Sequence, residues 1–260
     1  MTDSLTGRVT LVTGGGKGIG KAIALALAEA GADVAICARK MAELEPVAEA
    51  VRAKGRRAFA TACDVTDAEQ VSRLPAAVGE ALGPIDILVN NAGASESHKF
   101  VGHPDDLWAR MLEINLTSVY RVCKAVVPGM VERKWGRIIT IASISSKVGA
   151  RYVAAYTASK HGVLGLMRAL AVELNPYHVT VNAICPGYVD TPMTDANVAN
   201  MIARTGKSEA EVRKILEATS PQNRLITPDE VAAVAVMLAG ESARGITAQA
   251  INVDGGTLTY

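Results

Sequence analysis

A tyrosine and a lysine four residues apart give this sequence its clearest chemical signal. Tyr156 and Lys160 lie in a stretch with helical periodicity, where side chains at this spacing share one face of the helix. A free tyrosine has a pKa of about 10, and a neighbouring ammonium group lowers that pKa by favouring the anion. Tyr152 competes for the role, but no lysine follows it at the fourth position. The pair therefore predicts a general acid or base, and an exposed helical Tyr/Lys pair is the alternative.

Two polar residues upstream of this pair extend the chemistry. Ser143 follows an apolar run and can donate a hydrogen bond to a substrate carbonyl oxygen. Asn115 interrupts an apolar helical stretch, so its amide, if buried, must bond to water, to backbone or to Lys160.

A glycine-rich turn follows the first apolar run of the chain. Gly14, Gly18 and Gly20 are spaced as T-G-x-x-x-G-x-G and open a helical pattern that begins at Lys17. Such glycines allow backbone N–H groups to approach a pyrophosphate, and the helix N-terminus adds unpaired donors. An ordinary loop is the alternative, but the position between the first strand and the first helix favours a dinucleotide site.

The end of the second predicted strand distinguishes between the two nicotinamide cofactors. An NAD site usually carries an acidic residue there to accept from the ribose hydroxyls, whereas here Arg39 and Lys40 follow Ala38. A guanidinium can form paired bonds to a 2′-phosphate, and Lys17 can supply a second positive charge. We therefore expect NADP(H), with ordinary surface cations as the alternative.

Two further strand ends carry polar or flexible residues. Asp64 and Val65 follow the third strand, where a carboxylate can accept from an adenine amino group. The turn after the fourth strand contains Asn91, Ala92 and Gly93 and combines backbone-bonding side chains with a flexible glycine. Each of these features alone is more often a turn than a site.

Apolar runs and helical periodicity alternate along the whole chain. This alternation predicts one α/β domain over residues 1–260, a Rossmann-type, doubly wound parallel sheet of seven strands with helices on both faces. Ligands of such sheets bind beyond the carboxyl ends of the strands. The expected strands are 9–13, 33–38, 58–63, 85–90, 137–142, 179–184 and 248–253, and the expected helices are 17–30, 41–54, 67–82, 105–133, 153–174 and 228–238.

Residues 188–224 read as a lid over an apolar substrate. Ser208 and Glu211 predict a capping box at the start of a helix in this segment, and Thr227 with Glu230 predicts another just after it. Simple packing of a small helical lid on the domain is the alternative. The apolar residues of the segment are Met193, Val198, Met201, Ile202, Val212, Ile215 and Leu216.

Bulk composition argues against several classes of function. The chain of 260 residues has a net charge of only +1, with basic residues scattered among acidic ones, which disfavours binding of nucleic acid or a charged membrane surface. The N-terminus lacks the pattern of a signal peptide and no apolar run could span a bilayer, so we expect a cytoplasmic protein. The four cysteines and four histidines lack metal-binding spacing, so no metal site is expected.

Taken together, the motifs resemble the short-chain dehydrogenase/reductase family over nearly the whole chain. The resemblance implies a catalytic tetrad of Asn115, Ser143, Tyr156 and Lys160 that interconverts a carbonyl and a secondary alcohol by hydride transfer. It also implies that Lys160 lowers the Tyr156 pKa and that Asn115 positions Lys160 through a water. The implied cofactor-binding residues are Gly14, Lys17, Gly18, Ile19, Gly20, Arg39, Asp64, Val65, Asn91, Ala92, Gly93, Tyr156, Lys160, Pro186, Gly187, Val189 and Thr191.

Two stretches of the chain and two of its helices bear on the substrate and on the assembly. The stretches 156–163 and 247–256 resemble bacterial β-ketoacyl and polyketide ketoreductases, which implies a small-molecule carbonyl substrate such as a 3-oxoacyl thioester or a similar apolar ketone. Aromatic, cyclic or steroid ketones are the alternative. A non-catalytic NADP-binding role is the other, although such relatives usually lack the tyrosine or lysine that this chain keeps. Apolar residues on more than one face of 105–133 and 153–174, with the resemblance, imply a homotetramer.

Overall fold

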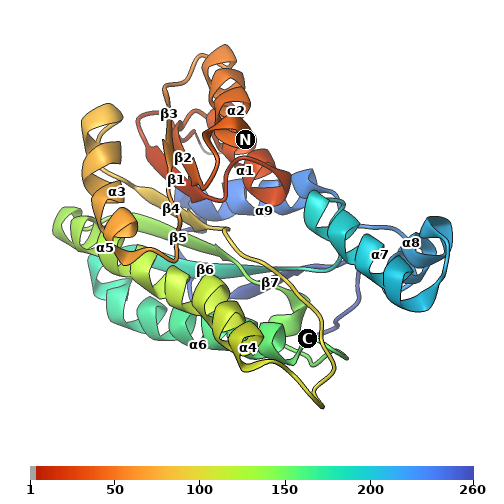
Figure 1. The fold of residues 1–260 in the computed structure, drawn as a ribbon. Helices are drawn as coiled ribbons and strands as arrows, with labels where there is room; N and C mark the ends of the chain where they lie inside the picture. The colour runs from red at the N-terminus through yellow and green to blue at the C-terminus, as the bar shows by residue number, and fades with distance from the viewer. Residues whose placement is uncertain (1–3) are drawn as a thin grey trace.

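Seven parallel strands form a single sheet in the computed structural model, which describes residues 4–260. The sheet has the order β3-β2-β1-β4-β5-β6-β7, so its direction of growth reverses between β1 and β4 (Figure 1). This arrangement confirms the predicted fold class. Residues 1–3, part of the N-terminal stretch considered above, lie outside the described residues. The strands are β1 (Val9–Thr13), β2 (Asp33–Ala38), β3 (Ala58–Ala62), β4 (Ile87–Asn90), β5 (Gly136–Ile141), β6 (Val179–Pro186) and β7 (Ala250–Val253).

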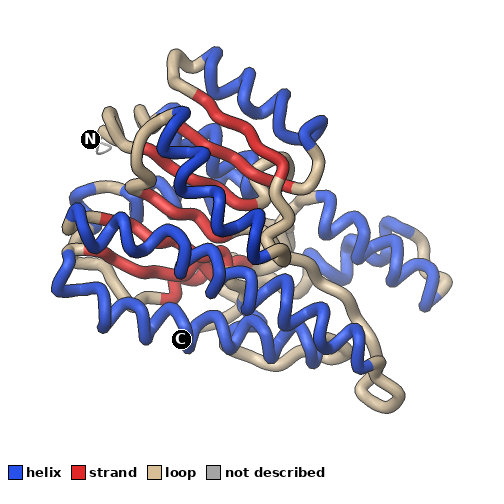
Figure 2. The backbone as a smooth tube through the Cα atoms, turned by 60° about the vertical axis from the view of Figure 1, so that its left-hand side comes forward, coloured by secondary structure: helices blue, strands red, loops and turns tan. Residues whose placement is uncertain are grey.

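Helices cover both faces of this sheet because successive strand side chains point to opposite faces (Figure 2). Leu11 packs with the helices of one face and the next residue, Val12, packs with those of the other. The first face carries α3 (Ala68–Ala81), α5 (Ser118–Arg133) and α6 (Ala154–Leu174). The second carries α1 (Gly18–Glu29), α2 (Met41–Ala53) and α9 (Pro228–Ala239).

The prediction of one continuous helix over residues 105–133 is wrong, because the helix is interrupted in its middle. The chain forms α4 (Asp105–Leu112), then a π-helical turn (Glu113–Thr117), and only then α5. Asn115 lies in the π-helical turn, where its side chain bonds to backbone outside and inside the helix. Single π-helical turns within α-helices are frequent at functional sites.

The segment after β6 forms two helices that project from one end of the sheet (Figure 1). The second, α8 (Glu209–Glu217), starts with the expected Ser208–Glu211 capping box, and α9 starts with the expected Thr227–Glu230 box. The first, α7 (Pro192–Thr205), has Thr191 as its N-cap and Pro192 at its first position. Among residues 4–260, no helix combines the length and apolar character needed to cross a membrane.

Candidate active site

The glycine-rich loop joins β1 to α1 at the point where the strand order reverses. Gly14 and Gly18 have φ angles of +65° and +52°, a backbone conformation that favours glycine. Gly20 allows close packing, because a Cβ there would lie 2.3 Å from the Gly14 carbonyl oxygen. Lys17, the N-cap of α1, makes no side-chain capping bond, so the first N–H groups of α1 have no such acceptor. This donor set suits an anionic group such as a pyrophosphate.

The turn after β4 holds the glycine-rich loop in place. Asn91 donates through Nδ2 to the carbonyl oxygens of Thr13 and Gly14, both at 3.0 Å. In return, Thr13 Oγ1 accepts from the backbone N–H groups of Asn91 and Ala92 at 3.0 and 3.1 Å. The side chain of Asn91, which the resemblance assigned to the cofactor, thus braces the loop.

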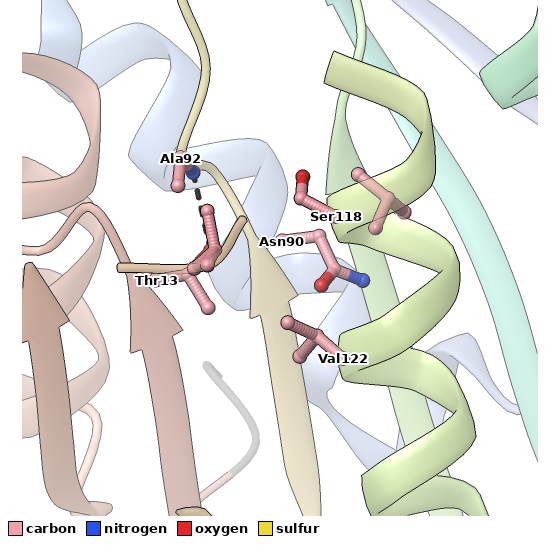
Figure 3. A pocket seen from close by; sticks show the side chains of 7 residues that line it. Thr13, Asn90, Ala92, Ser118 and Val122 are labelled. Carbon is pink, nitrogen blue, oxygen red and sulfur yellow. Dashed lines mark hydrogen bonds between the residues drawn. The ribbon is translucent and has the colours of Figure 1, made fainter. Parts of the chain in front are cut away.

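A small hollow opens beside these bonds, between the ends of β1 and β4 and the start of α5 (Figure 3). Ala92 from the β4 turn and Val65 from the β3 turn both line it, so two expected cofactor residues from different loops share one surface. The lining residues are Thr13, Val65, Asn90, Ala92, Ser118, Val119 and Val122.

The basic residues expected around a 2′-phosphate differ in their partners. Arg39 is exposed and makes no hydrogen bond or ion pair with any residue of 4–260. Lys17 instead pairs with Glu43, with 3.3 Å between Nζ and Oε1. The sequence analysis did not predict a role for Glu43, because no local pattern links it to Lys17, 26 residues away. Asp64 accepts through Oδ1 from the Thr66 N–H and hydroxyl at 2.9 and 2.7 Å, so one carboxylate oxygen shapes its own turn.

The structure brings Ser143, Tyr156 and Lys160 together beyond the carboxyl end of β5. Ser143 lies two residues after the end of β5, and the other two lie in the first two turns of α6. Lys160 is buried and donates through Nζ to the Ile141 carbonyl oxygen at 2.9 Å, and this Nζ lies 5.7 Å from the centre of the Tyr156 ring. Burial lowers the pKa of Lys160 to about 8.

The Tyr156 hydroxyl behaves differently from the expectation. Burial raises its pKa above the usual value, and the main opposing influence is a side-chain hydrogen bond with Ser143. The prediction that Lys160 lowers the pKa of Tyr156 is therefore wrong, since the pKa is raised and Lys160 is not among the groups that influence it. The physical reason is that Tyr156 loses its water, while the Lys160 ammonium is turned to the Ile141 carbonyl rather than to the phenol.

Asn115 is fully buried and bonds to backbone, one of the three partners considered for it. Its Nδ2 donates to the carbonyl oxygens of Ala94 and Met111 at 2.9 and 3.1 Å, and its Oδ1 accepts from the Ala94 N–H at 3.1 Å. Gly93 separates Asn115 from the lysine, since a Cβ on Gly93 would lie 2.8 Å from Asn115 Oδ1 and 3.9 Å from Lys160 Nζ. Asn115 thus fixes the backbone next to Lys160 without touching its ammonium group.

The residues at and after the end of β6 lie next to β7 and the glycine-rich loop. The Gly187 N–H donates to the Val253 carbonyl oxygen at 3.0 Å, which joins the Pro186–Gly187 turn to β7. Val189 pairs with Ile226 in an isolated bridge. A Cβ on Gly18 would lie 3.3 Å from Thr191 Cγ2, so Thr191 faces the glycine-rich loop. Ile19, by contrast, packs its side chain into the core below α1.

The helices α7 and α8 divide the apolar residues of the 188–224 segment into two groups. Val198, Val212 and Leu216 form a buried cluster of their own, against which Met201 and Ile202 pack. These residues therefore hold the two helices together, as simple packing would require. Met193 and Ile215 remain exposed.

Two hydrogen bonds join this segment to the loop after β4. Arg204 of α7 donates to the hydroxyl and carbonyl oxygens of Ser97 at 3.3 and 2.9 Å. Ser97 lies in the loop between β4 and α4, so the two segments approach each other across the end of the sheet.

Comparison with known proteins places this geometry in a family. The model of the short chain dehydrogenase family matches residues 8–202. The crystal structure of a variant of actinorhodin polyketide ketoreductase with NADPH superposes with a TM-score of 0.94 at 41% identity, covering 97% of this chain and 98% of that one. A 3-oxoacyl-(acyl-carrier-protein) reductase of Pseudomonas aeruginosa is 38% identical over 97% of this chain and 98% of its own length. A D-beta-hydroxybutyrate dehydrogenase of Rhizobium meliloti is 34% identical over 96% and 98%, respectively. The chain belongs to the short-chain dehydrogenase family, and it is an oxidoreductase that interconverts ketones and secondary alcohols.

Proposed function

We propose that this protein is an NADPH-dependent ketoreductase whose proton donor is Tyr156. One observation carries the proposal. The Tyr156 hydroxyl lies near enough to the Ser143 side chain for Ser143 to oppose the rise of the Tyr156 pKa. Both residues lie beyond the carboxyl edge of the sheet, and Tyr156 is on the same helix as buried Lys160. Two neighbouring hydroxyl groups can both turn toward one carbonyl oxygen, so that one stabilises a developing alkoxide while the other protonates it.

The residues around the glycine-rich loop fit NADP(H). The uncapped N-terminus of α1 would hold the pyrophosphate, and Arg39 with Lys17 would hold the 2′-phosphate. Lys160 would hold the nicotinamide ribose, and Thr191 the nicotinamide amide. The cofactor, when bound, supplies the hydride. The polyketide ketoreductase that this chain resembles in structure was solved with NADPH, which supports the same cofactor here.

The chain's own residues manage the proton. Tyr156 donates its hydroxyl proton to the substrate oxygen in reduction and accepts one in oxidation. Its raised pKa favours the protonated form, which is the form needed for reduction. Ser143 stabilises negative charge on the same oxygen, and Asn115 positions the backbone beside Lys160.

A 3-oxoacyl thioester or a similarly apolar ketone is the proposed substrate. One relative of this chain is a 3-oxoacyl-(acyl-carrier-protein) reductase and another is a D-beta-hydroxybutyrate dehydrogenase, so both names describe an oxo or hydroxy group at carbon 3 of an acyl chain or a carboxylic acid. The second candidate is a cyclic or aromatic ketone, favoured by the likeness to a polyketide ketoreductase. Residues 188–224 would form the lid over either substrate.

A substrate panel tests the proposal. NADPH oxidation would be followed with acetoacetyl-CoA, longer 3-oxoacyl thioesters, acetophenones, decalones and 3-ketosteroids. We expect kcat/KM for thioesters to rise with chain length until the pocket is full, because each buried methylene adds at most about 0.8 kcal/mol to binding. Reduction of a polycyclic or aromatic ketone with no turnover of thioesters would establish the second candidate. No turnover of any ketone would favour a binding-only protein.

We further propose a cytoplasmic homotetramer. The four cysteines, Cys37, Cys63, Cys123 and Cys185, are all free thiols and buried, as is usual in a reducing compartment. Trp108, Tyr120 and Val172 on α4, α5 and α6 are exposed, which supports an interface on this side of the sheet.

A further inference from the structure

Lys17 and Glu43 form an ion pair beside the proposed 2′-phosphate site. Lys17 lies in the loop from β1 to α1, and Glu43 lies in the first turn of α2. Their Nζ and Oε1 atoms are 3.3 Å apart, and the two side chains are 62% and 32% exposed, respectively. The pair is thus open to solvent and to a ligand arriving at the carboxyl end of β2.

Backbone packing holds Glu43 in this place. The N–H groups of Gly14 and Gly15 donate to the Cys37 carbonyl oxygen at 2.7 and 3.3 Å, which presses the glycine-rich loop onto the end of β2. A Cβ on Gly16 would lie 2.9 Å from both the Cβ and the carbonyl oxygen of Glu43. The backbone of Glu43 is therefore in contact with the loop, and its carboxylate stays within reach of Lys17.

Among the charged side chains near this pair, Glu43 is the carboxylate that contacts a proposed ligand of the 2′-phosphate, namely Lys17. Arg39 and Lys40 form the whole connection between β2 and α2, and Arg39 makes no ion pair with residues 4–260. Asp64, the acidic residue at the end of β3, bonds to Thr66 instead. A 2′-phosphate held by Arg39 and Lys17 would consequently meet the Glu43 carboxylate.

From this geometry we propose that Glu43 reduces the preference for NADP(H) over NAD(H) by competing with the 2′-phosphate for Lys17. The inference rests on the proposed use of NADP(H). A phosphate carries a charge of about −1.5 to −2 at pH 7. To bind Lys17 it must displace the Glu43 carboxylate or share Lys17 with it, and the carboxylate repels the phosphate. Glu43 therefore weakens the binding of phosphorylated cofactor, while a cofactor without the 2′-phosphate is unaffected.

Two small probes isolate this effect from catalysis. Adenosine 2′,5′-bisphosphate carries the 2′-phosphate and adenosine 5′-monophosphate does not, and calorimetry would measure the binding of both to the full chain. We expect Glu43→Gln to bind the bisphosphate about three- to ten-fold more tightly, the scale expected for removing one partly solvated like charge, with monophosphate binding unchanged. The gain should shrink as salt is added.

Three further variants make the test specific. Glu45→Gln removes the same charge from an exposed position of the same helix and should leave both affinities unchanged. Lys17→Met should weaken bisphosphate binding, and the gain from Glu43→Gln should fall substantially in a Lys17→Met background. Glu43→Ala should reproduce the gain if Glu43→Gln is poorly folded, since both variants remove the carboxylate.

The outcomes separate this inference from the function on which it rests. Equal bisphosphate affinity in wild type, Glu43→Gln and Glu43→Ala would overturn the role of Glu43. An undiminished gain without Lys17 would overturn competition for that lysine. Arg39→Ala should weaken the bisphosphate and spare the monophosphate. If it weakens neither or both equally, the 2′-phosphate site itself is wrong.

Discussion

Burial acts in opposite directions on the two titrating residues of the candidate site. It raises the pKa of Tyr156 and lowers the pKa of Lys160 to about 8, because a desolvated side chain favours its neutral form. A protonated tyrosine suits the donation of a proton to a substrate oxygen. The buried ammonium of Lys160, by contrast, costs stability, and such a cost is common where a side chain serves function.

Tyr156→Phe tests the role of the hydroxyl. We expect turnover to fall by about two to four orders of magnitude while cofactor affinity is retained, because the change removes the proton donor and little else. Stopped-flow reduction and fluorescence titration with NADPH would measure the two quantities. Tyr152→Phe, at an exposed tyrosine four residues away, is the matched control and should stay active. Near-normal turnover of Tyr156→Phe would remove Tyr156 from the mechanism.

Lys160→Met tests the cost of the buried charge. The pKa of Lys160 falls from 10.5 to about 8 on folding, so the unfolded chain binds more protons between these values and the free energy of unfolding rises with pH there. Below pH 8 both states are protonated and the full cost is present. Removing the amine should therefore raise the free energy of unfolding at pH 7 by about 1–3 kcal/mol, an advantage that disappears toward pH 10.5.

Urea denaturation of the cofactor-free variant and wild type at pH 7 and pH 10, at equal protein concentration, would measure this difference. The same variant should have lost its activity. A Lys160→Met protein that is less stable than wild type at pH 7 would show that the bond to Ile141 outweighs the buried charge.

At the scale of elements, the π-helical turn between α4 and α5 connects the helix layer to the loop after β4. Asn115 supplies this connection through three bonds, two of them to Ala94. Ala94 follows the Asn91 turn that braces the glycine-rich loop. The turn therefore links backbone near Lys160 to backbone near the proposed cofactor site.

Asn115→Ala should loosen this part of the chain. The variant leaves the N–H and carbonyl groups of Ala94 without their partner, and we expect a loss of about 2 kcal/mol in the free energy of unfolding. Hydrogen exchange should accelerate in residues 91–99 more than in β5. Asn200→Ala, at an exposed position of α7, is the control and should change neither quantity. Unchanged exchange in residues 91–99 would mean that other contacts hold this loop.

At the scale of the whole molecule, one layer of helices leaves apolar side chains in water. Val172 of α6 is 77% exposed, and Trp108 and Tyr120 are exposed on α4 and α5. Gly162 of α6 is already used within the chain, because a Cβ there would lie 2.7 Å from Leu116 Cδ2. Gly165, by contrast, faces open space and would allow another chain to approach closely.

The expected assembly is a homotetramer that uses this layer. Light scattering at micromolar concentration should give four times the 27.1 kDa mass of the chain. Val172→Glu should reduce that mass, because a charge buried in an interface without a partner is strongly unfavourable. Ile215→Glu, at an exposed residue of α8, should not. A monomer mass for the wild type would contradict the proposed assembly.

The sequence by itself predicted the fold, which the structure confirms, and it nominated most residues of the candidate site. Strand and helix periods are local properties, so the alternation of apolar runs and amphipathic stretches was enough to predict a doubly wound parallel sheet. The glycine spacing and the Tyr156–Lys160 spacing are local as well. Capping boxes at Ser208 and Thr227 were confirmed for the same reason, since each depends on four consecutive residues.

Only the tertiary structure decided what each side chain meets. The pairing of Lys17 with Glu43, the brace from Asn91 to Gly14 and the bonds of Asn115 to Ala94 join residues from separate elements. The direction of the Tyr156 pKa shift depends on how far burial removes water from the hydroxyl. The four-residue spacing between Tyr156 and Lys160 carries no information about that burial. Likewise, Leu216 has the apolar character of a substrate contact, and only packing assigned it to the interior of α7 and α8.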